Sequence, residues 1–280
     1  MPKRQIVNLD PIELSYLEWP GQEPVLLLHG LADNACVWLS LGEALAGTYQ
    51  VLAPDMRGHG ESSKPETGYT FLELIADLEG LMAARGWSSA HVIGHSWTGK
   101  LAAIWARYHP ERLRSLVLVD PIFIWKMPEV FRLTFPLLYR TLPFLKSMGP
   151  FSSYAVAEAQ AKGLKQFRGW SDLQRQVFEA GIEQKSEGCW GSKFTVPARN
   201  GIFADVMRVA GLTEVLEIPS LLILPEQGFN RFNWQIESYP RYLQNLEVAR
   251  VPGNHWPFLG EPEAFNHIVI KFLEGVGCRV

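Results

Sequence analysis

The stretch His91-Val92-Ile93-Gly94-His95-Ser96-Trp97-Thr98-Gly99-Lys100 decides the fold. It joins an apolar run, typical of a buried strand, to a segment with helical spacing that continues to Tyr108. The turn between them places Ser96 after the strand and at the start of the helix. A serine lifted above a sheet in this way can act as a nucleophile, because N–H groups at a helix start favour negative charge. The sequence therefore predicts that Ser96 is a catalytic nucleophile.

The turn departs in one position from the usual nucleophile pattern, Gly-x-Ser-x-Gly. Thr98 occupies the last position, and glycine is displaced to Gly99. A β-branched residue fits there only if the backbone is helical and the packing leaves room. The alternative is an ordinary Gly-His-Ser turn without chemistry. We favour the catalytic interpretation because the strand–turn–helix context is the one that the motif requires.

Apolar runs bounded by turn signals alternate with helical spacing on both sides of this stretch. Such alternation predicts an α/β fold with a mostly parallel central sheet. The expected buried strands are residues 25–28, 50–53, 91–93, 116–119, 220–224 and 248–251, and the expected helices are 72–85, 100–108 and 263–273. Two earlier runs, around residues 6–7 and 14–16, predict an opening hairpin across Asp10-Pro11.

Residues 121–217 break this rhythm, since they lack a clear parallel strand and contain prolines, aromatic residues and helical segments such as 172–182. A structureless loop of that length is not expected inside a compact domain. We interpret the segment as a mostly helical cap inserted into a core formed by residues 1–120 and 218–280. Large aromatic residues are concentrated near its start: Phe123, Trp125, Phe131, Phe135, Tyr139, Phe144 and Phe151.

Composition excludes several classes of protein. The chain has 280 residues, of which 47% are hydrophobic and 20% charged, and its net charge is −3. These values predict an ordinary core and no basic surface for nucleic acid. No apolar run reaches the roughly 18 residues of a membrane span, and no signal peptide is evident. Cys36, Cys189 and Cys278 are odd in number and far apart, which argues against a disulfide framework or a zinc site and favours a cytoplasmic location.

The candidate general base is His255, in the run Val251-Pro252-Gly253-Asn254-His255-Trp256-Pro257-Phe258. This run follows a strand candidate and precedes a helix. An imidazole there can take the proton of Ser96 and return it to a leaving group, because its charge changes in the useful pH range.

A developing oxyanion needs two N–H donors. One is the residue after the nucleophile, Trp97, and the other is expected in the loop after an earlier strand, where Leu31 follows His29-Gly30. Gly30 would let that backbone approach the reacting centre. For His29 we favour a structural role under the loop.

These motifs together resemble those of α/β-hydrolase-fold enzymes over nearly the full length of the chain. The segment Asp55-Met56-Arg57-Gly58-His59-Gly60-Glu61-Ser62 is similar to the family's Asp-x-Arg-Gly-x-Gly-x-Ser turn, and the His255 loop is similar to its Gly-x-x-His loop. The resemblance implies a mostly parallel sheet with helices on both faces and a cap. It also implies that Asp55 and His59 shape a turn and are not catalytic.

The acid of the triad is displaced from its usual place. In the family it follows the strand that corresponds to residues 221–224, but here Pro225-Glu226-Gln227-Gly228 has glycine at the expected position. One candidate is Asp120, which follows the strand 116–119, where some family members carry the acid. The rival is Glu226, whose longer side chain could reach the imidazole. We favour Asp120, and a third alternative is that no acid exists.

The resemblance implies a serine hydrolase that cleaves a carboxylic ester or related acyl compound through an acyl-enzyme, without cofactor or metal. Haloalkane dehalogenases and epoxide hydrolases share the cap and loops but use an aspartate nucleophile, and Ser96 argues against both. Carbon–carbon bond hydrolases, cofactor-free haloperoxidases and a non-catalytic or weakly catalytic ligand-binding member remain open. Phe123, Trp125 and Trp256 are expected to line a pocket for an apolar or aromatic small molecule. The sequence leaves the oligomeric state open.

Overall fold

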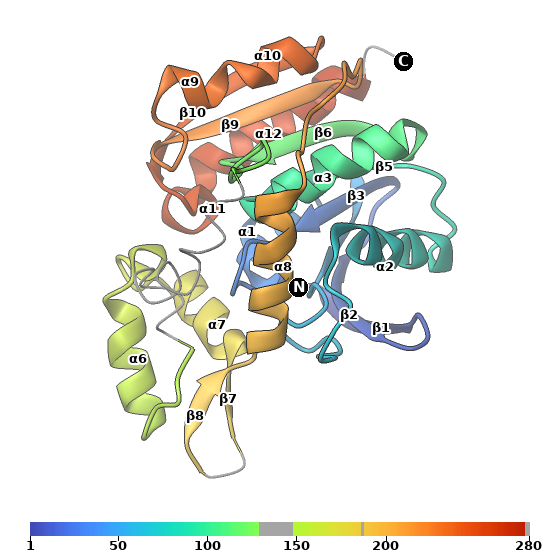
Figure 1. The fold of residues 1–280 in the computed structure, drawn as a ribbon. Helices are drawn as coiled ribbons and strands as arrows, with labels where there is room; N and C mark the ends of the chain where they lie inside the picture. The colour runs from blue at the N-terminus through green and yellow to red at the C-terminus, as the bar shows by residue number, and fades with distance from the viewer. Residues whose placement is uncertain (129–147, 186–187, 278–280) are drawn as a thin grey trace.

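The computed structural model describes residues 1–128, 148–185 and 188–277. An eight-stranded sheet with the order β1-β2-β4-β3-β5-β6-β9-β10 forms its centre (Figure 1). The strands are β1 (Lys3–Asn8), β2 (Glu13–Trp19), β3 (Glu23–Leu28), β4 (Tyr49–Pro54), β5 (Ala90–His95), β6 (Leu113–Val119), β9 (Ser220–Gln227) and β10 (Leu246–Asn254). From β4 to β10 neighbouring strands are parallel, whereas β1 pairs antiparallel with β2, and β2 with β4. The predicted mostly parallel sheet and its opening hairpin are confirmed.

Helices cover both faces of the sheet, as predicted. Alternate residues of each strand point to opposite faces, and in β3 Leu26 and Leu28 belong to one apolar core while Val25 and Leu27 belong to the other. The first core contains α2 (Phe71–Ala84) and α3 (Trp97–Tyr108), and the second contains α1 (Leu39–Leu45), α11 (Pro257–Gly260) and α12 (Pro262–Gly277). Burial on both faces explains why these strands are continuous apolar runs.

Local sequence sets the start of α2. Thr70 accepts a hydrogen bond from Glu73 N–H through Oγ1 at 3.3 Å, and Thr70 N–H donates to Glu73 Oε2 at 2.9 Å. This reciprocal capping box satisfies two N–H groups that a helix start leaves without partners.

The described part of the segment between β6 and β9 is richer in structure than predicted. It holds α6 (Tyr154–Lys162), the short helix η4 (Lys165–Phe167), α7 (Asp172–Gly181), the hairpin β7 (Ile182–Gln184) and β8 (Trp190–Ser192), then α8 (Val196–Arg208). Helix α7 confirms the helix predicted over 172–182. Strands of three residues are too short to leave an alternating pattern, which is why the hairpin was not predicted. Phe131, Phe135, Tyr139 and Phe144 lie outside the described residues.

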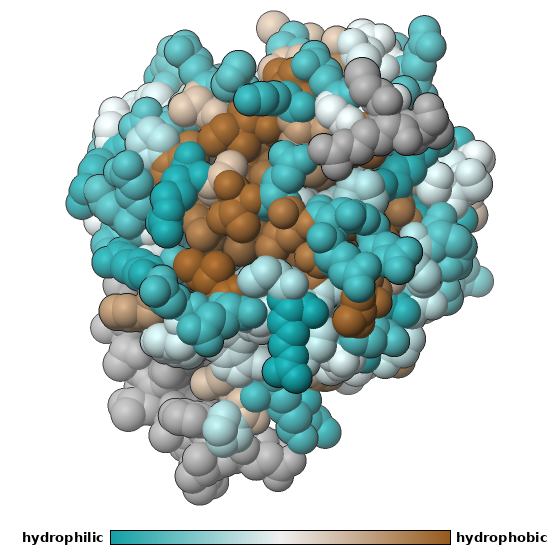
Figure 2. Space-filling model, turned by 90° about the horizontal axis from the view of Figure 1, so that it is seen from above, coloured by the Kyte–Doolittle hydropathy of each residue, from teal (hydrophilic) through white to brown (hydrophobic). Residues whose placement is uncertain are grey.

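Hydrophobic side chains also reach the surface. In a view from above, Figure 2 shows hydrophobic residues gathered within a rim of hydrophilic ones. The exposed large hydrophobic residues include Phe229, Phe232 and Trp234, all between β9 and the end of α9 (Asn233–Ile236). An exposed apolar patch with a polar rim is typical of a ligand-binding or contact surface. Within the ranges that the structure describes, no helix combines the length and apolar character needed to cross a membrane.

Candidate active site

Ser96 stands at the turn between β5 and α3 with a backbone conformation that only a tight turn imposes. Its φ is 59° and its ψ is −118°, a region that L-residues rarely adopt and that commonly marks functional sites. Gly94 makes the turn possible, since a Cβ there would lie 2.5 Å from Thr98 O. The residue after Ser96 already belongs to the helix, so the serine lies directly at the helix N-terminus.

Thr98, which replaces the usual glycine, fits because it lies inside α3 and its hydroxyl is bonded. Thr98 Oγ1 donates to Leu28 O at 2.8 Å and accepts from His95 N–H at 3.0 Å. The side chain is buried and ties the serine turn to the end of β3. The departure from the motif is therefore compatible with a formed turn.

His255 follows β10 and lies beside Asp120. His255 Nδ1 is 2.6 Å from Asp120 Oδ2, which indicates that Nδ1 carries the proton and donates it. Ser96 and His255 line the same cavity. Among the described residues no hydrogen bond joins Ser96 Oγ to His255 Nε2, and such bonds often tighten only when substrate binds.

Asp120 is held by the loop that follows β9. Its carboxylate accepts bonds from Phe229 N–H at 2.7 Å, Asn230 N–H at 3.1 Å and Asn230 Nδ2 at 2.8 Å. Burial alone would raise the pKa of Asp120, but the bonds from His255, Phe229 and Asn230 outweigh it and lower the pKa below its ordinary value. The carboxylate is thus kept ionised next to His255.

Gly228 explains why the acid cannot lie at its usual position. A Cβ at residue 228 would be 2.5 Å from Asp120 Oδ2, so the carboxylate of Asp120 occupies the space that a side chain at 228 would need. Glu226 is exposed near the end of β9, and within the described part of the chain it makes no hydrogen bond to His255. The structure brings Asp120 to the imidazole and leaves Glu226 away from it.

The two expected oxyanion donors border the cavity. Leu31 follows Gly30 in the loop after β3, and Trp97 is the first residue of α3. The N–H of a first helical residue has no partner inside its helix. Gly30 cannot be replaced without displacement, because a Cβ there would lie 2.5 Å from His95 Nδ1.

His29 makes the contacts of a structural residue. Its Nδ1 lies 2.8 Å from Gly30 O, and its Nε2 accepts from Met56 N–H at 2.9 Å. Burial lowers the pKa of His29, so the neutral ring with its proton on Nδ1 satisfies both contacts.

A cavity of about 320 Å³ opens over these groups. The three residues predicted to contact substrate, Phe123, Trp125 and Trp256, all line it. Its other described lining residues include Leu31, Asp33, Trp97, Ile122, Met127, Ile202, Phe203, Val206, Phe229 and Trp234. The walls are thus dominated by apolar and aromatic side chains, which suits an apolar ligand. In the ranges 1–128, 148–185 and 188–277, no group of three or more His, Cys, Asp or Glu residues is arranged to hold a metal ion.

Three polar residues near the site were not predicted as functional. Asn230 holds the acid, His95 Nε2 lies 2.8 Å from His255 O, and Asp33 accepts from Trp256 Nε1 at 3.1 Å. The only sequence signal was their position in loops after strands or directly before Ser96, where active sites of α/β sheets form.

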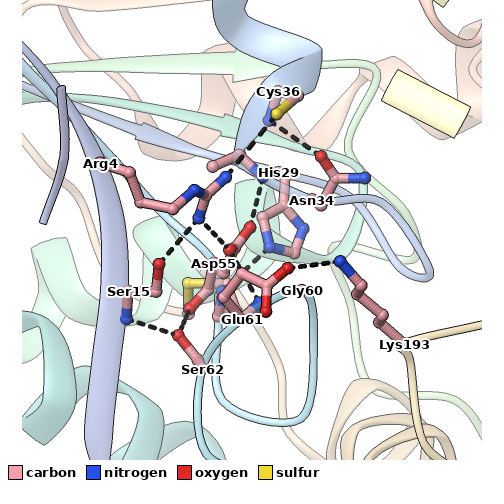
Figure 3. Close-up of polar contacts among 12 residues, drawn as sticks. Arg4, Ser15, His29, Asn34, Cys36, Asp55, Gly60, Glu61, Ser62 and Lys193 are labelled. Carbon is pink, nitrogen blue, oxygen red and sulfur yellow. Dashed lines mark hydrogen bonds and ion pairs between the residues drawn. The ribbon is translucent and has the colours of Figure 1, made fainter. Parts of the chain in front are cut away.

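Asp55 and His59 belong to a buried turn, as expected. Figure 3 shows Asp55 at the centre of a network in which Oδ2 accepts from Arg4 at 2.7 Å and from Glu61 N–H at 3.0 Å, while Oδ1 accepts from Ala35 N–H at 2.7 Å. Ala35 begins the short helix η1 (Ala35–Trp38), directly after the loop that carries Leu31, so the network fixes the end of that loop. His59 is buried, and burial lowers its pKa well below the ordinary value.

Replacing Asp55 by alanine is expected to destabilise the protein by about 3 kcal/mol, because buried N–H groups and Arg4 lose their acceptor. Urea unfolding of the wild type and the variant measures the difference in their free energies of unfolding. The reaction of Ser96 with a fluorophosphonate in the folded fraction is expected to persist. Unchanged stability together with lost labelling would instead give Asp55 a chemical role.

Lys100 is a buried cation beneath the cavity wall. Its Nζ donates to Trp125 O at 3.1 Å and to Val206 O, and both residues line the cavity. Burial lowers the pKa of Lys100 from 10.5 to about 7, partly opposed by Asp205. A neutral amine retains two N–H donors, so both contacts survive loss of the proton.

Stability is expected to depend on pH through this lysine. Between pH 7 and 10.5 the unfolded chain holds the proton and the folded chain does not. The free energy of unfolding should therefore rise with pH, by roughly 1.4 kcal/mol per unit, and become flat below pH 7. Subtracting the profile of Lys100→Met from that of the wild type isolates this contribution. A difference that stays constant from pH 7 to 10 would contradict the assignment.

Comparisons with known proteins agree with this architecture. A family model described as alpha/beta hydrolase fold matches residues 23–146. Fluoroacetate dehalogenase from Burkholderia sp is 25% identical over 97% of this chain and 93% of its own length. The 2-(acetamidomethylene)succinate hydrolase of Mesorhizobium japonicum is 32% identical over 41% of each chain. The crystal structure of E-2-(acetamidomethylene)succinate hydrolase superposes with a TM-score of 0.82 at 22% identity, covering 98% of this chain and 100% of that one.

Proposed function

Because the chain belongs to the α/β-hydrolase superfamily, we propose that it is a serine hydrolase that cleaves a carboxylic ester or related acyl compound. The observation that carries the proposal is that Ser96 and His255 line one cavity while His255 is bonded to the carboxylate of Asp120. Ser96 follows β5, Asp120 follows β6 and His255 follows β10, with 2.6 Å between His255 Nδ1 and Asp120 Oδ2. These positions support the assignment of Ser96 as nucleophile, His255 as base and Asp120 as acid of a catalytic triad.

The proposed reaction proceeds in two halves. Ser96 Oγ attacks the acyl carbon while His255 Nε2 takes its proton, and Asp120 stabilises the imidazolium. The N–H groups of Leu31 and Trp97 hold the oxyanion. Collapse expels the alcohol with the proton from His255 and leaves an acyl-enzyme. Water then attacks the acyl carbon, gives a proton to His255, and the acid leaves as Ser96 recovers its proton.

The chemistry of serine favours acyl substrates over the halide and epoxide substrates that the names of two relatives, fluoroacetate dehalogenase and a soluble epoxide hydrolase from Corynebacterium sp. (strain C12), indicate. An alkyl group transferred to Ser96 would form an ether, which water does not cleave, whereas an acyl group forms an ester that water cleaves. Only the acyl route therefore regenerates the enzyme.

We assign substrate binding to the cavity between the serine turn and residues 121–217, which we propose as a cap. Phe123 and Trp125 come from the start of this segment, and Trp256 follows the base. Their rings offer a surface for an apolar or aromatic acyl or alcohol group.

A fluorophosphonate tests the proposal, since it reacts covalently with an activated serine. Mass spectrometry is expected to find one adduct on Ser96 of the folded protein and none in Ser96→Ala. The wild-type protein should also hydrolyse p-nitrophenyl esters, and Ser96→Ala should not. A folded protein without adduct or turnover would refute the hydrolase and leave a ligand-binding member of the fold.

A further inference from the structure

The cavity contains a buried carboxylate that the proposed reaction does not use. Asp33 is 5% exposed and follows the oxyanion loop. Its Oδ2 accepts from Trp256 Nε1 at 3.1 Å, whereas Oδ1 has no hydrogen-bond partner in the part of the chain that the structure describes. Asp33 lines the main cavity and also a smaller one of about 60 Å³. Because Asp33 borders the cavity and no protein group in that part of the chain donates to Oδ1, this oxygen can face a donor or a positive charge on a ligand.

The neighbouring histidine does not neutralise Asp33. His95 Nε2 must carry a proton to bond His255 O at 2.8 Å, and His95 Nδ1 lies 3.6 Å from Asp33 Oδ2, beyond a hydrogen bond. Burial, followed by the nearby His255, lowers the pKa of His95, so its ring is neutral near pH 7. His95 therefore gives Asp33 neither a hydrogen bond nor a counter-charge.

The rest of the wall suits a positive charge. Four tryptophans and three phenylalanines line the cavity: Trp97, Trp125, Trp234, Trp256, Phe123, Phe203 and Phe229. Aromatic faces attract cations, and cages of such rings bind ammonium groups. No lysine or arginine is found among the described residues of this lining. Aromatic walls with one buried carboxylate form the environment of a cation site.

We propose that the substrate is an ester that carries an ammonium group, with Asp33 as its counter-charge and the aromatic rings as its cage. This proposal rests on the proposed function, because it assigns the substrate class of the same cavity. Asp33 then determines specificity and takes no part in bond breaking. An anionic ester would meet the carboxylate and bind poorly.

Two esters of equal shape test the charge preference. Butyrylcholine and 3,3-dimethylbutyl butyrate differ only by a positively charged nitrogen in place of a carbon, and a pH-stat measures both rates. The wild type is expected to favour the cation by about tenfold in kcat/KM. In Asp33→Asn this ratio is expected to fall severalfold, because only the attraction of the aromatic rings remains. Asparagine keeps an acceptor for Trp256 Nε1, so the loop is preserved.

Asp172→Asn is the matched control, because it removes a carboxylate whose side chain is 85% exposed and does not line the cavity. Its ratio should equal that of the wild type. A wild-type ratio of one or less, or a ratio unchanged in Asp33→Asn, would overturn the proposal even if Ser96 is labelled and neutral esters are cleaved.

Binding gives a readout that does not depend on turnover. Phenyltrimethylammonium should quench the tryptophan fluorescence of the wild type at lower concentration than its neutral counterpart, tert-butylbenzene, and the difference should be several times smaller in Asp33→Asn. If Ser96 is not labelled, the proposed hydrolase function is refuted, but this titration still tests whether the cavity binds cations. Equal binding of the two ligands by the wild type would reject the site.

Discussion

Replacement of Asp120 by alanine is expected to lower kcat for a p-nitrophenyl ester by about 10⁴, the effect of losing the acid of a triad. Without the carboxylate, His255 loses the partner that holds Nδ1 at 2.6 Å and the counter-charge of its cation. Glu226→Ala is the matched control, because Glu226 is exposed at the end of β9, and its kcat should be unchanged. If kcat fell in Glu226→Ala and not in Asp120→Ala, Glu226 would be the acid of the triad.

A second substitution should restore much of the lost activity. Since a Cβ at residue 228 would lie 2.5 Å from the Asp120 carboxylate, aspartate at 228 reaches the vacated space in Asp120→Ala/Gly228→Asp. We expect kcat of the double variant to be about 10²-fold higher than that of Asp120→Ala. This factor is at the lower end of the rate gains that a positioned proton-transfer group gives. Gly228→Asp alone should impair the wild type, because two carboxylates would compete for one site. A folded double variant no faster than Asp120→Ala would contradict this geometry.

Replacement of Ser96 is expected to lower turnover more than any other substitution, and one of its two replacements should also stabilise the fold. Both Ser96→Ala and Ser96→Gly should reduce kcat by about 10⁶, as removal of a serine nucleophile does. With φ at 59° and ψ at −118°, residue 96 is in a region open to glycine but strained for other residues, so Ser96→Gly should also gain about 1 kcal/mol.

Ser96→Ala is the control for that gain, because alanine keeps the strain. The difference in free energy of unfolding between the two variants, measured by thermal or urea unfolding, gives the cost of the backbone strain at residue 96. Equal stabilities would show that the turn stores no strain. If both variants retained turnover, Ser96 would be excluded as the nucleophile.

The fold was predictable because its central strands β3, β4, β5, β6 and β9 are largely buried on both faces and therefore read as apolar runs. Ser96 was recognisable because its motif lies between a strand and a helix, and His255 because it follows the last strand. Asp120 was favoured because it ends a strand after which some members of the family carry the acid. The donors that hold it could not be predicted, since the N–H groups of Phe229 and Asn230 have no signature in the residue types. Asp33 escaped notice for a similar reason: its significance depends on Trp256, 223 residues away.

The network around Asp55 has a practical consequence for handling the protein. Arg4 lies in β1, the first strand, yet its partner Asp55 also accepts from Ala35, directly after the loop that carries Leu31. The first few residues are thus coupled to the reacting centre through one buried carboxylate. A shortened chain that begins after β1, or an affinity tag fused so closely that β1 cannot pair with β2, should therefore be less stable than the full chain, while its folded fraction keeps a reactive Ser96.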